Sequence, residues 1–277
     1  MRQTLSTAFR RVLRLENRRI AVRAGRLEKI QGFASSVLEN TRDITIYLPG
    51  GYDERPERRY PVLYMADGQN LFEPERAFIP GQHWQLREAA DHAIGARTAE
   101  PMIIVGVDDA GAQRIDEYTP VREEARSGGG KASHYGRFLL EELKPVVDQG
   151  FRTESARTSI AGSSLGGLLV MHLALTLSDV FESAAVISPS VWWAERAILA
   201  EVDAFAGLRR PRLWLDIGGR EGREALADAR ALRDHLMAKG WHGENFEYYE
   251  DRRADHSERA WAGRVRTVLE FLFPLRR

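Results

Sequence analysis

The feature of this sequence that most constrains its fold is a stretch in which a strand, a tight turn and a helix follow one another without a break. At its centre, residues 162–166 read Gly-Ser-Ser-Leu-Gly and match the pattern Gly-x-Ser-x-Gly. In this pattern a serine occupies a strained corner between strand and helix, and its hydroxyl projects from the sheet. Glycines are needed two positions away, because the backbone there comes too close to its neighbours for a Cβ atom. The pattern predicts Ser164 as a nucleophile.

Ser163 is the alternative nucleophile in the same stretch. Two positions away it is flanked by Ala161 and Leu165 instead of glycines. At a strand-to-helix corner of this kind its side chain would point away from the site, so Ser164 is favoured.

Strand and helix patterns alternate from Pro61 to the C-terminus, with no internal repeat and no linker. Besides the strand that leads into the corner, strands are predicted at 60–66, 101–107, 183–188, 213–217 and 245–249. Helices are predicted at 84–94, 135–147, 165–175, 195–206, 225–239 and 257–273. This alternation predicts an α/β fold, a mostly parallel doubly wound sheet with helices on both faces. Sites in such folds lie at the carboxyl ends of the strands.

The N-terminal part of the chain has a different pattern. Residues 1–19 are basic and predict an arm or surface helix, so a single α/β domain is expected over 20–277. Short apolar stretches at 20–38 predict an antiparallel hairpin at the sheet edge, and residues 43–49 alternate like a strand. A long polar segment at 110–133 predicts a loop that covers the site.

Composition narrows the function classes. The 40 basic and 40 acidic residues cancel, so nothing indicates a nucleic-acid partner, and a neutral or apolar small substrate fits better. The absence of cysteine excludes disulfides, thiolate catalysis and cysteine-based zinc sites. No apolar run approaches the roughly 18 residues of a membrane span, and no signal-peptide pattern is present. We expect a cytoplasmic protein with no membrane partner; a homo-oligomer is left open.

A serine nucleophile needs an imidazole to take its proton and a carboxylate to orient that imidazole. On this class of fold the expected chain order is serine, acid, histidine. His235 lies within a predicted helix, and His242 lies in a turn at the wrong end of the sheet. His256 follows the last strand at the correct end and is predicted as the base.

Two acids compete for the third position. Asp216 lies within a predicted strand, where a structural hydrogen bond is a sufficient role. Glu221 lies just past the end of that strand, in a loop that can approach His256, and is favoured because such an acid is recognised by its geometry and not by its type.

Negative charge that develops on a substrate oxygen during the reaction must be stabilised by hydrogen-bond donors. The amide of Leu165 is one candidate, and a second is expected after an early central strand, where Asp67, Gly68 and Gln69 form a turn. Gln69 is predicted as the second donor, and Asp67 and Gly68 are expected to line the substrate site. A surface turn is the alternative interpretation.

Trp192 and Trp193 follow another strand end on the same rim. Adjacent aromatic side chains there can form a wall for an acyl or aryl group. At least one of the two is expected to pack into the core instead.

Taken together, these stretches resemble the putative esterase family of α/β-hydrolases, which includes esterase D, enterochelin esterases, feruloyl esterases and the mycolyltransferase antigens. The similar segments are residues 46–49 with 52–53, 61–65 with 67–68, the Gly-x-Ser-x-Gly turn, 187–190 with Trp192, 218–221 and His256. The resemblance covers about residue 43 to the C-terminus. It implies an α/β-hydrolase fold, Ser164, Glu221 and His256 as a triad, and no cofactor. Ala254 departs from the pattern, since a glycine is more usual there.

The resulting hypothesis is a serine carboxylester hydrolase that works through an acyl-enzyme and acts on a small or medium ester. An acyltransferase with the same triad and a catalytically silent binding module are the alternatives. A siderophore trilactone, a feruloyl or acetylated sugar and a thioester such as S-formylglutathione all remain open as substrates.

Overall fold

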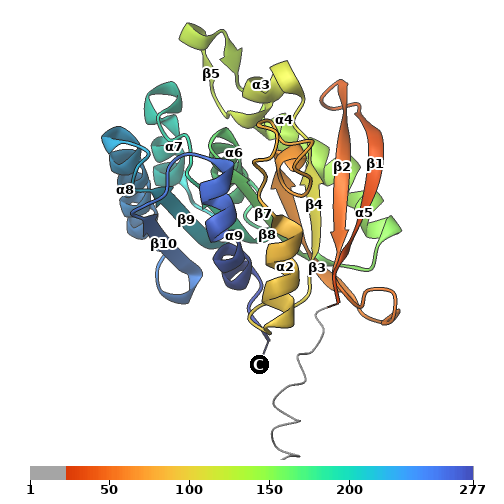
Figure 1. Cartoon of the computed structure of the whole chain (residues 1–277). Helices are drawn as coiled ribbons and strands as arrows, with labels where there is room; N and C mark the ends of the chain where they lie inside the picture. Colours follow the sequence, from red (N-terminus) through yellow and green to blue (C-terminus); the bar gives the residue numbers. More distant parts are fainter. Residues whose placement is uncertain (1–22, 277) are drawn as a thin grey trace, which may run out of the picture.

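A computed structural model describes residues 23–276 and is built on one large sheet (Figure 1). The predicted basic arm at 1–19 lies outside the described residues. Within these described residues, the sheet has eight strands in the order β1-β2-β4-β3-β7-β8-β9-β10. Their bounds are β1 Arg26–Ser35, β2 Asn40–Leu48, β3 Tyr60–Ala66, β4 Ile103–Val107, β7 Thr153–Ser163, β8 Phe181–Ile187, β9 Arg212–Gly218 and β10 Phe246–Asp251. Only β2 runs against its neighbours, so the predicted mostly parallel sheet is confirmed.

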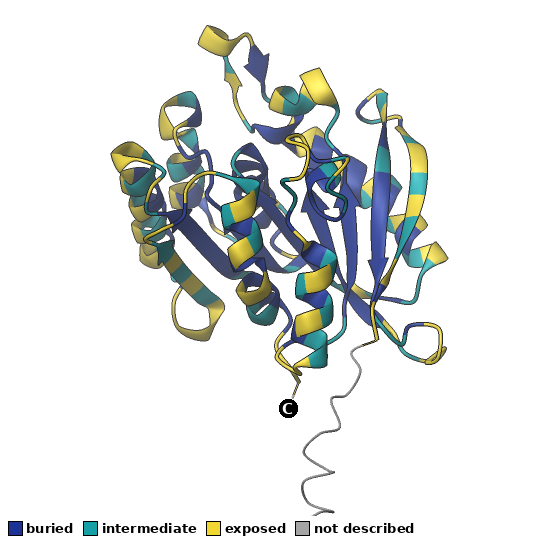
Figure 2. Ribbon diagram, viewed as in Figure 1, coloured by how far each residue is buried: buried dark blue, intermediate teal, exposed yellow. Residues whose placement is uncertain are grey.

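Helices cover both faces of the sheet, as predicted. On one face α2 (Leu86–Gly95) and α9 (Glu258–Leu272) pack together over one apolar cluster, and both lie in front of the sheet in Figure 1. The other apolar cluster lies under the helices α4 Ala132–Arg137, α5 Lys144–Gly150, α6 Leu165–Thr176, α7 Trp193–Ala204 and α8 Arg223–Ala238. The central strands are buried, whereas the edge strands β1 and β10 and the outer helix surfaces are partly exposed (Figure 2). Among the described residues, no helix has the length and apolar character needed to cross a membrane.

The edge hairpin differs from the prediction in its position. Residues 26–35 form one strand, and its antiparallel partner is β2, so the hairpin extends beyond the predicted 20–38. The predicted antiparallel pairing at the sheet edge is present and only its bounds differ, because Gly32 does not end the strand. Gly32 instead has φ +59° and lies where the register between β1 and β2 shifts, which is a bulge within a continuous strand.

The segment 110–133 also differs from the prediction, because it is not a structureless loop. It contains α3 (Arg114–Tyr118) and a small hairpin of β5 (Arg122–Glu123) and β6 (Gly128–Gly129). Both project from one edge of the molecule in Figure 1. The main chain of this segment is tied down by Asp116, whose carboxylate accepts from the amide of Gly129 at 2.7 Å. Polar residues that bond to their own backbone produced the loop-like pattern.

The topology itself creates a crevice for a site. The strands β3 and β7 are neighbours, yet the chain leaves β3 toward β4 on one side and leaves β7 toward β8 on the other. At such a point the connections diverge, and a cleft opens at the carboxyl ends of the strands. The turn that begins at Asp67 follows β3, and Ser164 follows β7.

Candidate active site

Ser164 lies at a strained corner between β7 and α6. Its backbone has φ 58° and ψ −122°, a conformation that L-residues rarely adopt, and its amide donates to the carbonyl of Ile187 at 3.0 Å. A Cβ atom on Gly162 would lie only 2.6 Å from the carbonyl oxygen of Gly166. The two glycines therefore let the strand and the helix approach closely enough to hold the serine in this conformation.

Gly162→Ala is expected to destabilise the fold by about 2 kcal/mol or more, because the added methyl group forces backbone against backbone. The free energy of unfolding in urea measures this. Gly263→Ala is the matched control, since a Cβ atom there meets nothing within 4 Å, and alanine favours the helix in which it lies. Equal stability of the two variants would contradict a close approach at the corner.

Three side chains from separate loops form a continuous chain of hydrogen bonds at Ser164. The Nε2 atom of His256 lies 3.0 Å from the Oγ of Ser164, and its Nδ1 atom lies 2.6 Å from the Oε2 of Glu221. His256 comes from the loop between β10 and α9, and Glu221 from the turn after β9. The glutamate side chain is 2% exposed and the imidazole 44% exposed. The carboxylate is thus shielded, while the imidazole faces the solvent side of the cleft.

The other oxygen of Glu221 is also fixed. Its Oε1 accepts from the hydroxyl of Ser188 at 2.6 Å and from the amide of Gly218 at 2.7 Å. Burial alone would raise the pKa of Glu221, but the hydrogen bonds from His256 and Ser188 outweigh it and hold the pKa below its ordinary value. The side chain therefore remains ionised at neutral pH.

The alternative acid, bases and nucleophile considered from the sequence do not join this chain of hydrogen bonds. Asp216 is fully buried and pairs with Arg264 at 2.9 Å, and its contacts do not include His256. His235 is bonded to Asp203 on the protein surface, at 2.7 Å. His242 is exposed, before the short turn that precedes β10. Ser163 is buried at the end of β7 and makes no hydrogen bond to His256.

An open pocket of about 460 Å³ lies over Ser164. Its wall is formed by the residues Asp67, Gln69, Asn70, Phe78, Ile79, Asp109, Gly111, Arg114, Ser163, Ser164, His256, Glu258 and Trp261. Within residues 23–276, no group of three or more histidine, aspartate and glutamate side chains is arranged to hold a metal ion.

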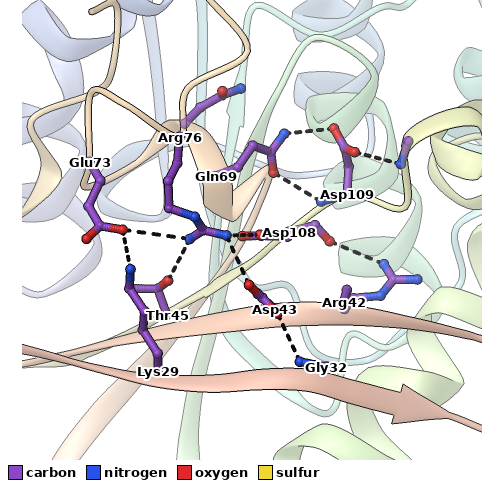
Figure 3. Close-up of polar contacts among 12 residues, drawn as sticks. Lys29, Gly32, Arg42, Asp43, Thr45, Gln69, Glu73, Arg76, Asp108 and Asp109 are labelled. Atoms are coloured by element: carbon purple, nitrogen blue, oxygen red, sulfur yellow. Dashed lines mark hydrogen bonds and ion pairs between the residues drawn. The ribbon is translucent and has the colours of Figure 1, made fainter. Parts of the chain in front are cut away.

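The turn after β3 is rigid where it faces this pocket. Gln69 lies in a single helical turn (η1, Gly68–Asn70), and its side chain exchanges two hydrogen bonds with Asp109, at 2.7 and 3.1 Å (Figure 3). A Cβ atom on Gly68 would lie 2.6 Å from the backbone of Gly106 in β4, so only glycine fits there. These contacts also fix the position of the backbone amide of Gln69, the predicted donor. The Leu165 amide, at the first position of α6, has no acceptor within its own helix.

Asp67 has a structural partner that the sequence did not reveal. Its carboxylate accepts two hydrogen bonds from Arg114 of α3, at 2.7 and 2.8 Å, and both side chains line the pocket. Arg114 belongs to the segment predicted as a loop, and one arginine among many basic residues carries no distinguishing signal.

A second network fixes the outer wall of the pocket. The rim loop, residues 71–85, carries Phe78, which is 80% exposed. The loop is anchored by Arg76, which contacts Asp108 at the end of β4 and bonds to the hydroxyl of Thr45 in β2 at 3.2 Å (Figure 3). Burial raises the pKa of Asp108 to about 6 despite the opposing effect of Arg76. Below that pH the carboxylate of Asp108 becomes neutral, so its contact with Arg76, which joins the rim loop to the sheet, is no longer an ion pair.

Neither of the two tryptophans is among the residues that form the wall of this pocket. Trp193 is buried, and its indole donates to the carbonyl of Val121 at 2.8 Å, as expected for the one that packs into the core. Trp192 is 44% exposed, and the guanidinium of Arg126 lies 4.6 Å from its ring centre.

Comparison of the sequence with known proteins identifies the family of this chain. A family model described as "Putative esterase" matches residues 35–272. The chain belongs to this esterase family. The ferri-bacillibactin esterase BesA of Bacillus subtilis is 32% identical over 162 residues, which is 56% of this chain and 56% of that protein. The siderophore triacetylfusarinine C esterase of Aspergillus fumigatus is 29% identical over 220 residues, 73% of this chain and 72% of that protein.

Among solved structures, the BES protein from Bacillus cereus superimposes with a TM-score of 0.73 at 21% identity. The match covers 99% of this chain and 98% of that one. The predicted family and its α/β-hydrolase fold are thereby confirmed.

Proposed function

We propose that this member of the esterase family is a serine carboxylester hydrolase that works through an acyl-enzyme. The observation that carries the proposal is the unbroken hydrogen-bond chain from Ser164 through His256 to Glu221, with its serine end in the pocket. A nucleophile, a base and an orienting acid in this order are the parts that acyl transfer requires.

In the first half of the reaction, the Oγ of Ser164 attacks the ester carbonyl while the Nε2 of His256 takes its proton. Glu221 holds the Nδ1–H and stabilises the imidazolium that forms. The carbonyl oxygen becomes an oxyanion, which the amides of Leu165 and Gln69 bind. The intermediate then collapses, and His256 returns the proton to the departing alcohol.

In the second half, water replaces the alcohol. His256 removes a proton from the water, which attacks the acyl carbon on Ser164. The bond to the Oγ of Ser164 then breaks, His256 returns the proton to this oxygen, and the acid leaves. No cofactor takes part in either half of this proposal.

The pocket supports a small or medium ester as the substrate. Phe78 and Ile79 on the rim loop offer an apolar surface, and the carboxylate of Asp67 is neutralised by Arg114. The relatives BesA and the triacetylfusarinine C esterase are named for siderophore substrates, so siderophore esters are the first class to assay.

Labelling by a fluorophosphonate tests the proposal directly, because this reagent phosphonylates activated serines. We expect one adduct, located by peptide mass spectrometry at Ser164, and loss of p-nitrophenyl acetate hydrolysis in proportion to labelling. An adduct at Ser163, or full activity after complete labelling of Ser164, would overturn it. Product analysis with and without an added alcohol separates hydrolysis from acyl transfer.

A further inference from the structure

We propose that Ser188 is a positioning residue that orients Glu221 toward His256. This inference rests on the proposed function, since it concerns how the acid of the triad is held. Ser188 follows β8 and lies beneath the site, with 1% of its surface exposed. It has φ 43°, a strained conformation for a residue with a side chain.

The contacts of the Ser188 hydroxyl determine the direction of its single proton. The Oγ atom lies 3.1 Å from the indole Nε1 of Trp261, 3.0 Å from Nη2 of Arg264 and 2.6 Å from Oε1 of Glu221. Indole and guanidinium nitrogens only donate hydrogen bonds. They occupy both lone pairs of the hydroxyl, so its proton is directed to Glu221.

The proton of Ser188 helps to fix the orientation of the Glu221 carboxylate. Within the part of the chain that the structure describes, Oε1 of Glu221 has two donors, Ser188 and the amide of Gly218, whereas Oε2 has one, the Nδ1–H of His256. The carboxylate cannot rotate without breaking two hydrogen bonds. The Oε2 atom is thus held in the position where it accepts from the imidazole of His256.

The donors behind Ser188 are themselves held in place. Arg264 of α9 is buried, and its Nη2 also donates to Asp216 at 2.9 Å. Asp216 accepts in addition from the indole of Trp214 at 2.8 Å. Asp216 also accepts from the amide of Ser188 at 3.3 Å, so it positions both this residue and the arginine that donates to its hydroxyl.

Loss of the Ser188 hydroxyl makes the carboxylate more basic, because one hydrogen bond to its ionised form disappears. The Nδ1 of His256 shares a hydrogen bond with this carboxylate, and a more basic carboxylate binds the protonated imidazole more strongly. The acid limb of the kcat/KM profile should therefore move to higher pH, since a protonated imidazole cannot accept the proton of Ser164.

The test compares Ser188→Ala with Ser183→Ala on a neutral p-nitrophenyl ester. Ser183 is a matched control on β8, a buried serine whose hydroxyl bonds to that of Ser159 at 2.8 Å, away from the pocket. For Ser188→Ala we expect kcat to fall about tenfold or more, with KM within about twofold. Its acid limb should move to higher pH by up to about one pH unit, because one hydrogen bond to a charged group sets the upper bound of the shift. Ser183→Ala should change neither.

An acid limb that stays in place or moves to lower pH in Ser188→Ala overturns the proposal, as does an equal shift in Ser183→Ala. Ser188→Gly accommodates the positive φ and replaces the alanine variant if that folds poorly. A ¹³C NMR titration of the Glu221 carboxyl carries the same test without turnover, with a higher midpoint expected only in the Ser188 variants. Absence of esterase activity in the unaltered protein would instead contradict the proposed function, and the NMR result would still decide the role of Ser188.

Discussion

Replacing Ser164 by alanine is expected to lower kcat for a short p-nitrophenyl ester by at least about 10⁴-fold, because loss of a triad nucleophile removes the covalent route entirely. Among the described residues, the hydroxyl makes two hydrogen bonds, to His256 at 3.0 Å and to Ser190 at 3.4 Å. Alanine keeps the backbone of the corner, so the free energy of unfolding should change by less than about 1 kcal/mol. Steady-state kinetics and urea unfolding measure the two quantities on the same preparation.

His256→Ala provides the companion measurement, with an expected loss of similar size. His235→Ala is its matched control, because His235 also bonds to a carboxylate, that of Asp203, but lies on α8 away from the pocket. Residual activity above about one tenth in Ser164→Ala, or an equal loss in His235→Ala, would remove the basis for the assignment.

The parts of the fold that could be predicted from sequence are those encoded by local patterns. The Gly-x-Ser-x-Gly turn and the alternating apolar runs each lie within a short window, and the corner and the parallel sheet follow from them. Segments whose polar residues bond to nearby backbone were predicted less well, as at 110–133. There the local pattern of a loop and that of short, anchored elements are the same.

The surroundings of the site depend on contacts between distant segments, which no local pattern carries. Arg114 meets Asp67 across 47 residues, and Arg264 meets Ser188 across 76. These contacts form only when α3 brings Arg114 to the end of β3 and α9 packs against β8. The residues Glu221 and His256 could be proposed because each follows a strand end, and their catalytic roles stay predictions.

The two acids considered for the triad should respond to substitution in opposite ways. Glu221→Gln is expected to lower kcat by about 10³- to 10⁴-fold while the protein stays folded. The glutamine oxygen can still accept from Ser188 and Gly218, which turns its NH₂ group toward the Nδ1 of His256. The imidazole must then carry its proton on Nε2 and cannot accept that of Ser164.

Asp216→Asn should instead cost about 3–5 kcal/mol of stability, because it leaves the buried charge of Arg264 unpaired. The fraction that folds should keep kcat within about tenfold of the original, since Asp216 reaches Glu221 through Ser188, whose amide and whose partner Arg264 both donate to Asp216. Urea unfolding and kinetics corrected for folded protein distinguish the two variants. A stable but inactive Asp216→Asn together with an active Glu221→Gln would reverse the assignment, because the orienting charge would then come from the strand and not from the turn that follows it.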